Sequence, residues 1–277
     1  MKVGLYSANR AEFIYVHLAV ISPQDVIIPI NNSLVDREVD YILKDGEASL
    51  LVTDTKLSVS IPSVDIHDLD FQARQRKASE APAFPSDLTE DEVCAFVYTS
   101  GTTGSPKGAM LTHRNLVRNV EQFTQMVIFK PEDKVLCVLP MFHCYGLTTV
   151  IHAGLMHGST IVILRSKNPS EIINAIVEHS VTMAIMVPPM YNLLARRGEP
   201  SVMQTVHDFI SGGAPIPQPV AQAFYDRFHH PVREGYGLTE ASPVVSVLPS
   251  DRLKYLTVGP AIPGVEVKIA TDREGPY

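Results

Sequence analysis

Residues 93–108 have the sequence VCAFVYTSGTTGSPKG. The apolar run Val93–Thr99 predicts a buried strand, and a helix pattern opens near Thr112, beyond the loop. Glycines in the loop allow successive backbone N–H groups to point into one concavity, and its hydroxyls and Lys107 add anion-binding groups. A loop of this composition directly after a strand predicts a phosphate-binding site.

Two other interpretations of this loop are weaker. A kinase-like Walker loop would end in Gly-Lys-Ser/Thr, whereas this one ends in Pro106-Lys107-Gly108. A solvated turn would have no reason to combine threonines and a lysine directly after a strand. The phosphate-binding interpretation is therefore favoured, and the Walker class is not.

Outward from this loop, short apolar runs alternate with helix-length periodic segments. We expect strands at Val3–Leu5, Asp25–Ile30, Ser49–Thr53, Val93–Thr99, Lys134–Leu139, Thr160–Leu164, Ala184–Val187 and ending at Phe209-Ile210. Helices are expected at Ala11–Val20, at Leu34–Leu43 and after Asn168-Pro169, where an amide side chain and a first-turn proline form a helix start. This alternation predicts an α/β fold of two stacked βαβ-type subdomains with mostly parallel sheets.

The expected organisation has four parts. Residues 1–71 form a first α/β subdomain that lacks its N-terminal portion, and the polar, Ala/Pro-bearing residues 72–92 form a linker. Residues 93–250 form a subdomain that binds ATP and acid, and residues 251–277 begin a β-rich segment that is incomplete.

Composition limits the class of protein. The chain has 277 residues, a hydrophobic fraction of 45% and a formal net charge of −7, which fits a globular protein and argues against nucleic acid as a partner. The cysteines, Cys94, Cys137 and Cys144, are too few for a disulfide framework and are expected to be reduced and buried. No secretory signal or membrane-spanning run is visible, so a cytoplasmic location is expected, with peripheral membrane contact left open.

Further motifs follow the loop in a fixed order. They are Ser211–Pro215 (SGGAP), Glu234–Glu240 (EGYGLTE), Val258–Pro260 (VGP) and Pro263-Gly264. Together with Thr99–Gly108 they resemble the adenylate-forming superfamily, which contains acyl-CoA synthetases, firefly luciferase and peptide-synthetase adenylation domains. The resemblance covers roughly residues 93–270, and within the superfamily the sequence is most similar to the acyl-CoA synthetases.

The resemblance implies an ATP site. The residues it assigns to the nucleotide are Thr99, Ser100, Gly101, Thr102, Thr103, Gly104, Lys107, Gly212, Gly213, Ala214, Glu234, Gly235, Tyr236, Gly237 and Thr239. In this pattern Tyr236 stacks on adenine and Thr239 binds a phosphate oxygen, while Glu234 helps to frame the purine. Thr99 and Glu240 are expected beside Mg²⁺, which prefers hard oxygen ligands.

The acid pocket is expected along Leu139–Leu147 (LPMFHCYGL). By resemblance His143 lies beside the carboxylate to be activated, where amino-acid-activating relatives carry an aspartate. Cys144 is rejected as a nucleophile, because the family needs none and no activating base is evident. The apolar run Met183–Met190 favours a fatty acid over an aryl acid.

The implied reaction joins an acid to coenzyme A. The carboxylate attacks the α-phosphorus of ATP, pyrophosphate leaves, and coenzyme A takes the acyl group from the adenylate. Lys107, Thr239, Glu240 and His143 are the expected catalytic residues.

The family's ribose-binding aspartate and its small C-terminal domain, which carries an adenylation lysine, have no counterpart up to Tyr277. Two alternatives to a complete ligase therefore stay open. One is a non-catalytic remnant that binds nucleotide or acid, and the other is half of a split synthetase completed by a separate C-terminal chain.

Overall fold

A computed structural model describes residues 1–22, 24–69, 89–99, 105–251, 254 and 256–269. Its strands are β1 (Lys2–Tyr6), β2 (Val26–Ile30), β3 (Leu50–Thr53), β4 (Ser63–Asp65), β5 (Val93–Thr99), β6 (Lys107–Thr112), β7 (Lys134–Cys137), β8 (Thr160–Ile163), β9 (Met183–Met186), β10 (Asp208–Ser211), β11 (Val232–Gly237) and β12 (Val244–Val247).

The helical elements connect these strands. They are α1 (Ala11–Ile21), α2 (Asp36–Asp45), α4 (His113–Phe123), α5 (Cys144–Gly146), the π-helix η2 (Leu147–His152), α6 (Ala153–Met156), α7 (Pro169–His179), α8 (Pro188–Arg197), α9 (Gln218–Phe228), and the 3₁₀ turns η3 (Pro200–Met203) and η4 (Thr239–Ala241).

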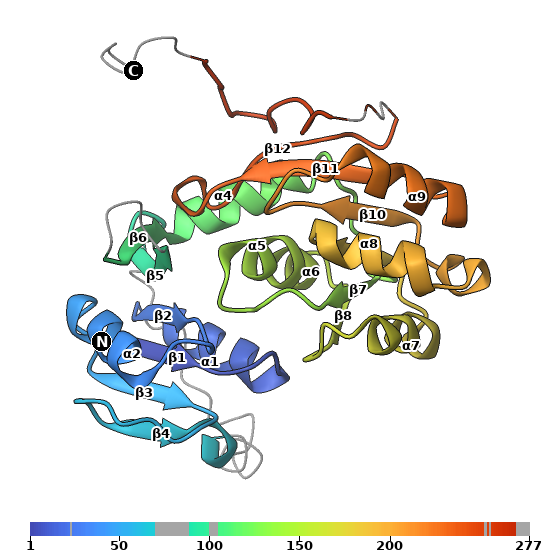
Figure 1. Ribbon diagram of the computed structural model, residues 1–277. Helices are drawn as coiled ribbons and strands as arrows, with labels where there is room; N and C mark the ends of the chain where they lie inside the picture. The colour runs from blue at the N-terminus through green and yellow to red at the C-terminus, as the bar shows by residue number, and fades with distance from the viewer. Residues whose placement is uncertain (23, 70–88, 100–104, 252–253, 255, 270–277) are drawn as a thin grey trace.

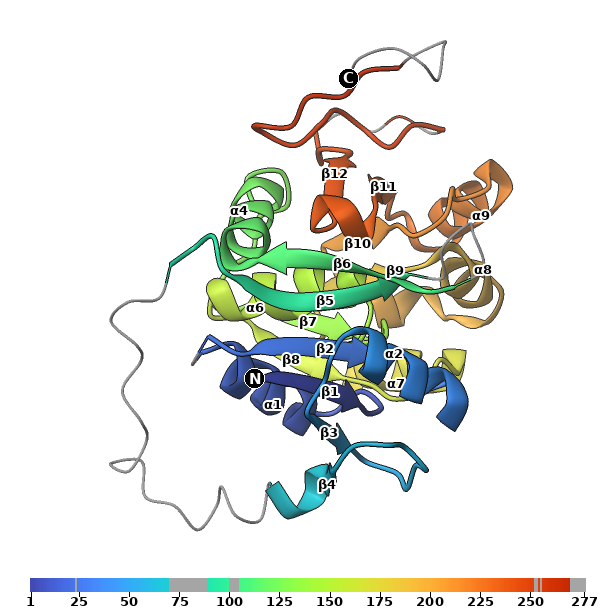
Figure 2. The same ribbon diagram turned by 90° about the vertical axis from the view of Figure 1, so that its left-hand side faces the viewer.

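The strands form two sheets of six, in the orders β4-β3-β1-β2-β5-β6 and β12-β11-β10-β9-β7-β8. Each sheet is parallel except for one antiparallel edge strand, β6 in the first and β12 in the second. Figure 1 shows the two sheets on either side of α5 and α6, and Figure 2 shows the long β5–β6 hairpin crossing the molecule below β10–β12. The predicted α/β class with mostly parallel sheets is confirmed.

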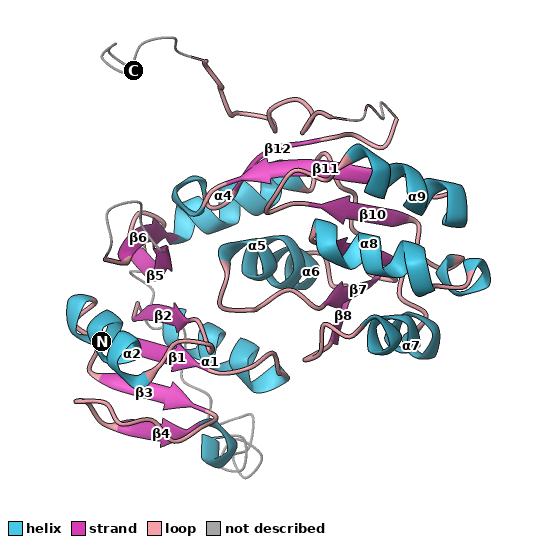
Figure 3. Ribbon diagram, in the orientation of Figure 1, coloured by secondary structure: helices cyan, strands magenta, loops and turns pink. Residues whose placement is uncertain are grey.

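Apolar packing arranges these elements in layers. One buried cluster joins α1, α4 and η2 to inner faces of both sheets, through residues such as Phe13, Phe123 and Val150. A second packs α7, α8 and α9 on the outer face of the second sheet, and a third packs α2 on the outer face of the first. Figure 3 shows the resulting alternation of helical and strand layers.

Local sequence accounts for several of these boundaries. The Asn168 side chain caps α7 by accepting from the Ser170 amide at 3.0 Å, and Pro169 occupies the first turn. Thr112 caps α4 in the same way, accepting from the Asn115 amide at 3.1 Å. Strand β5 has the predicted bounds, and the other predicted strands agree with the structure within two residues at each end.

Two features differ from expectation. Strand β6 was expected to be loop, because Lys107-Gly108 continues the polar composition of the preceding residues. Strand β5 pairs with β2, and β6 pairs with β5, so both strands belong to the first sheet, although residues 93–250 were expected to form the second subdomain. The predicted linker at residues 72–92 lies mostly outside the described residues.

The three cysteines are free and buried, as predicted. Within the described part of the chain, no helix has the length and apolar character needed to span a bilayer.

Candidate active site

A cavity of about 770 Å³ lies where the β5–β6 hairpin faces β10, β11 and β12. Its wall brings together most of the described residues that the motifs single out. Those that line it are Thr99, Lys107, His143, Gly212, Gly213, Gly235, Tyr236, Gly237, Thr239 and Glu240. Segments more than a hundred residues apart in sequence therefore meet in one chamber.

The first sheet supplies the side of this cavity that the sequence predicts to bind phosphate. Thr99 ends β5 and Lys107 begins β6, and the two are register partners across the hairpin. The antiparallel pairing thus places a hydroxyl and an ammonium side by side at the same edge. The predicted residues Ser100, Gly101, Thr102, Thr103 and Gly104 lie outside the described residues.

His143 lines the cavity from the segment after β7. It is the N-cap of α5, and its Nδ1 accepts a hydrogen bond from the Tyr145 amide at 3.1 Å. Because Nδ1 acts as an acceptor, the neutral ring carries its proton on Nε2. Desolvation lowers the pKa of His143, although the side chain stays open to the cavity. The ring is therefore a neutral donor, suited to a carboxylate oxygen.

Cys144 is not poised for nucleophilic attack. Burial raises the pKa of its thiol, and Glu240 raises it further by charge repulsion, whereas a nucleophile needs the thiolate. Its Sγ contacts Thr239 Oγ1 at 3.2 Å. Cys144 therefore links the Leu139–Leu147 segment to the η4 turn that carries Thr239, and its raised pKa agrees with its rejection as a nucleophile.

The second sheet supplies an aromatic face. Tyr236 lines the cavity and is 51% exposed, so one face of its ring is free to stack on a planar base. A β-carbon on the next residue, Gly237, would lie 2.3 Å from the Pro243 carbonyl oxygen, so only glycine fits there. A register irregularity between Tyr236 and Gly237 turns the strand at this point.

The Ser211–Pro215 loop lies beside this aromatic face. Gly213 has a φ of +78°, and a β-carbon on Gly212 would lie 2.8 Å from the Tyr145 ring, so both positions favour glycine. Ala214 follows them in the loop but does not line the cavity.

Glu234 is placed behind the cavity, not in its wall. It is 5% exposed, and its Oε1 accepts from the Ile216 amide at 2.9 Å. Burial raises the pKa of this carboxyl. Glu234 thus holds the residue that directly follows the Ser211–Pro215 loop, and its expected part in framing the purine stays a prediction.

Thr239 and Glu240 lie on the short turn η4, at the boundary between the two walls. Thr239 is buried and Glu240 is exposed, and both reach the cavity that Thr99 also lines. Among the described residues no group of three or more His, Cys, Asp or Glu could form a metal cage. One carboxylate and one hydroxyl nevertheless fit Mg²⁺, which commonly takes few protein ligands and completes its shell with phosphate and water.

A second cavity, of about 740 Å³, adjoins the first and shares Thr99, His143 and Thr239 with it. Its other walls come from α2 and the β5–β6 hairpin, including Arg37, Tyr41 and Pro106. The shared residues are those expected beside the reacting groups, so the two cavities approach the same point from different sides.

The apolar wall of the main cavity lies outside the sequence motifs. Phe123, Ile210, Val244 and Val247 line it from α4, β10 and β12. Each of them lies in an ordinary apolar run, and nothing in such a run distinguishes a residue facing a cavity from one facing the core.

The fold and site define a class: a two-sheet α/β protein whose β5–β6 hairpin faces a glycine-flanked tyrosine across a partly apolar cavity. Residues 1–277 match the family described as "AMP-binding enzyme". The chain belongs to this family, whose matched relatives are acid–CoA ligases.

Two curated relatives illustrate the match. 4-coumarate–CoA ligase 3 from Oryza sativa subsp. japonica is 38% identical over 181 residues, covering 63% of this chain and 33% of the relative. Feruloyl-CoA synthase from an Amycolatopsis species is 31% identical over 252 residues, covering 89% of this chain and 51% of the relative. The chain therefore spans about half the length of these relatives or less.

Solved structures share the architecture. ATP-bound MatB from Rhodopseudomonas palustris is 28% identical with a TM-score of 0.85, and the match covers 95% of this chain and 55% of that chain. O-succinylbenzoate coenzyme A synthetase (MenE) from Bacillus subtilis, in complex with AMP, is 25% identical with a TM-score of 0.86, covering 99% of this chain and 71% of that chain.

Proposed function

We propose that the chain activates a carboxylic acid with ATP, forming an acyl-adenylate that is then converted to an acyl-CoA thioester. One observation carries this proposal: Lys107, Tyr236 and His143, which suit phosphate, base and carboxylate respectively, line a single cavity. The names of the matched ligases and the nucleotide complexes of the structural neighbours support it.

In the proposed adenylation step a carboxylate oxygen forms a bond to the α-phosphorus of ATP, and the bond from that phosphorus to the bridging oxygen of pyrophosphate breaks. Lys107 and the loop that includes Ser100–Gly104 would stabilise the charge on the phosphates. Tyr236 would hold the adenine ring, and His143 would donate its Nε2 proton in a hydrogen bond to the acid. The protein's contribution is mainly orientation and charge stabilisation.

Thr99 and Glu240 are the residues that would hold Mg²⁺. The ion, when bound, would neutralise charge on the triphosphate. Thr239 would bind a phosphate oxygen next to it.

The second cavity offers a route for the coenzyme A thiol. It reaches Thr99, His143 and Thr239 without passing the tyrosine face, so a thiol could approach the acyl carbon while the nucleotide is in place. The thiol would release its proton to solvent as its sulfur bonds to the acyl carbon. The bond from the acyl carbon to the phosphate oxygen would break, and AMP would leave with those bonding electrons.

The acid is proposed to be apolar, because Phe123, Ile210, Val244 and Val247 form the inner wall. A fatty acid is one candidate. A hydroxycinnamic acid is the other, favoured by the names of the curated relatives and by Tyr145 and Thr149, which line the same cavity.

The test is ATP–pyrophosphate exchange with the purified chain, magnesium and two acid panels, fatty and hydroxycinnamic. Acid-dependent exchange that is lost in Lys107→Ala and Glu240→Ala would support adenylation, and the better panel would assign the acid class. A folded chain that binds ATP without exchange would instead favour the binding remnant or the split synthetase. Exchange restored by adding a separately expressed C-terminal domain of a relative would identify the split form.

Three further sequence predictions stand beside this function: a cytoplasmic location, peripheral membrane contact and a separate C-terminal partner chain. Cell fractionation and co-purification of the tagged chain would test them together. Recovery in the soluble fraction with a smaller partner polypeptide would support the first and third predictions.

A further inference from the structure

Asn9, in the loop after β1, reaches from the first sheet to the second. Its Nδ2 donates to the carbonyl oxygens of Leu139 at 2.8 Å and Leu164 at 3.1 Å, and its Oδ1 accepts from the Met141 amide at 2.9 Å. Its own backbone oxygen accepts from Arg165 Nε at 3.2 Å. One side chain thus connects the ends of β1, β7 and β8.

These contacts use both protons of the Asn9 side-chain amide and its oxygen, so the amide nitrogen has no donor left over. No isosteric side chain can replace this pattern. An aspartate would place a carboxylate oxygen against two carbonyl oxygens, and an alanine would leave those groups without their partner.

The contacts fall on the turn that carries His143. The His143 amide donates to the Pro140 carbonyl at 3.2 Å, which closes a turn over Pro140–His143. Asn9 holds one residue before this turn, Leu139, and one inside it, Met141. A shift of the turn would therefore move the His143 ring with it.

The same segment is held from the opposite side. Directly after His143, the Cys144 Sγ contacts Thr239 Oγ1 at 3.2 Å. The histidine that lines both cavities thus lies between a contact to the first sheet and a contact to the nucleotide motif.

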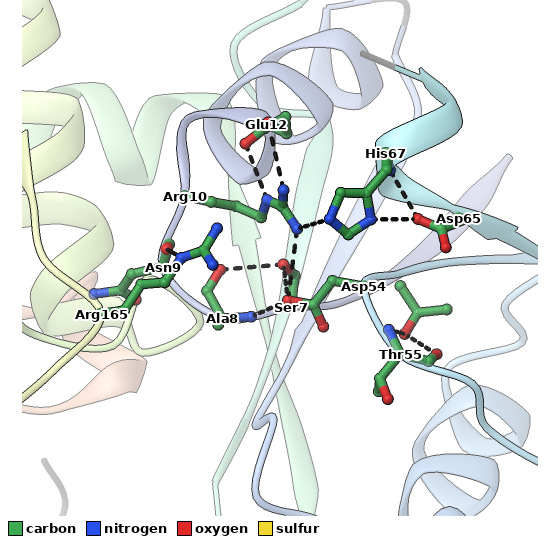
Figure 4. Close-up of polar contacts among 11 residues, drawn as sticks. Ser7, Ala8, Asn9, Arg10, Glu12, Asp54, Thr55, Asp65, His67 and Arg165 are labelled. Carbon is green, nitrogen blue, oxygen red and sulfur yellow. Dashed lines mark hydrogen bonds and ion pairs between the residues drawn. The ribbon is translucent and has the colours of Figure 1, made fainter. Parts of the chain in front are cut away.

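The loop that carries Asn9 is itself fixed by a polar cluster, shown in Figure 4. Asp54 Oδ2 accepts from Ser7 Oγ at 2.9 Å and from the Ala8 amide at 3.0 Å. Arg10, only 8% exposed, donates to Glu12 at 2.9 Å and to His67 Nε2 at 3.0 Å. The residues on both sides of Asn9 are therefore anchored, which makes Asn9 a rigid support.

We infer that Asn9 is a positioning residue for the reaction: it fixes, from the first sheet, the turn that aims His143 at the acid. It acts through the Leu139–His143 backbone and does not itself touch substrate. The catalytic part of this inference rests on the proposed function, whereas the effect on His143 does not.

The decisive variant is Asn9→Asp, which keeps the size of the side chain. It replaces the NH2 group that donates to the Leu139 and Leu164 carbonyl oxygens with a carboxylate oxygen, which can only accept. Asn115→Asp is the matched control, because Asn115 is exposed and, among the described residues, its side chain only accepts, from the Thr112 amide at 2.9 Å. Asn9→Ala is the second variant, which decides the matter if the aspartate variant does not fold.

The first measurement follows the His143 ring by NMR, assigned by comparison with His143→Gln. We expect its signal to be displaced in Asn9→Asp and Asn9→Ala and unchanged in Asn115→Asp. In Asn9→Asp the displacement should diminish as the pH falls, because a protonated carboxyl can again donate to the Leu139 carbonyl. Asn9→Ala should show no such recovery.

The second measurement is acid-dependent exchange. We expect kcat/KM for the acid to fall at least about tenfold in Asn9→Asp, with the KM for ATP within about twofold of wild type. An unchanged His143 signal, or a lower unfolding temperature with unchanged acid kinetics, would overturn the inference. If wild type itself shows no exchange, the proposed function fails, and the His143 signal still decides whether Asn9 positions that ring.

Discussion

The two walls of the cavity have the same architecture and different chemistry. Each is the end of a parallel sheet that finishes in one antiparallel strand, β6 on one side and β12 on the other. The β5–β6 edge presents polar groups, with Lys107 exposed, whereas the β11–β12 edge presents a tyrosine fitted between glycines. A β-carbon at Gly237 would meet backbone at 2.3 Å, while one at Gly108 would meet the Tyr98 ring at 3.1 Å.

In the proposed reaction, this difference gives the two walls different parts in recognising ATP. The first-sheet wall supplies charge, which counts most when negative charge develops on the phosphates. The second-sheet wall supplies shape, which holds the ground state and the transition state alike. Substitutions on the first wall should therefore mainly change rate, and those on the second should mainly change binding or stability.

The largest expected effect comes from the β5–β6 wall, which carries Lys107. Lys107→Ala should lower the rate of ATP–pyrophosphate exchange by about two to three powers of ten, because a preorganised positive group is lost. Lys130→Ala, an exposed lysine that does not line the cavity, is the control. If Lys107→Ala raised only the KM for ATP and left the rate unchanged, the claim that this wall mainly affects the rate would be contradicted.

The second effect concerns the place where the two halves of the molecule join. His17 on α1 is fully buried and His152 on η2 is partly buried, with 2.9 Å between their Nε2 atoms. Burial lowers the pKa of both, that of His152 to about 4 from 6.5. As the pH falls, these histidines therefore bind protons at a higher pH in the unfolded chain than in the folded chain. The free energy of unfolding should fall as the pH drops from 6.5 toward 4.

For His152 alone the loss reaches about 3 kcal/mol near the lower end of that range. Urea unfolding of wild type and His152→Leu at several pH values would measure it, with exposed His179→Leu as the control. The variant should have a flatter pH dependence. If the free energy of unfolding of His152→Leu depends on pH as steeply as that of wild type, the histidine pair is not the cause of the loss of stability in acid.

The third effect concerns the β11–β12 wall, where Gly237 lies against the backbone of Pro243. Gly237→Ala should lower the free energy of unfolding by about 1–3 kcal/mol, because backbone must move to admit the new methyl group. Gly108→Ala should cost less, since the Tyr98 ring can shift. Equal losses measured by urea unfolding would remove the contrast between the two walls.

The smallest expected effect is on base stacking. Tyr236→Ala should weaken AMP binding about tenfold, the usual order for losing one aromatic platform, with the rate at saturating ATP little changed. Tyr225→Ala, a comparably exposed tyrosine on α9, is the control. Isothermal titration with AMP would show whether the ring contributes affinity at all.

Much of the fold could be predicted from the sequence, because parallel strands buried on both faces give clear apolar runs. The run Val93–Thr99 and the capped start at Asn168 are examples. The edge strand β6 could not be predicted, since it is exposed on one side and begins with Lys107-Gly108. The short strand β4 has three residues, too few for a pattern.

Some residues of the candidate site could also be predicted from the sequence, and others could not. Residues in glycine-rich motifs, such as Lys107 and Tyr236, could be singled out because their composition is unusual for a core. The role of Glu234 behind the Ser211–Pro215 loop could not, because it depends on a hydrogen bond to Ile216. Asn9 carries no local signal either, since all its partners lie more than a hundred residues away.

The most direct test of the central claim, that both walls together form an acyl-adenylate, is a single-turnover reaction without coenzyme A. The folded chain would be mixed with ATP, magnesium and an apolar acid, and the products identified by mass spectrometry. The account predicts an acyl-adenylate and free pyrophosphate, both absent in Lys107→Ala. Bound, unreacted ATP with no adenylate for any acid of either panel would contradict it.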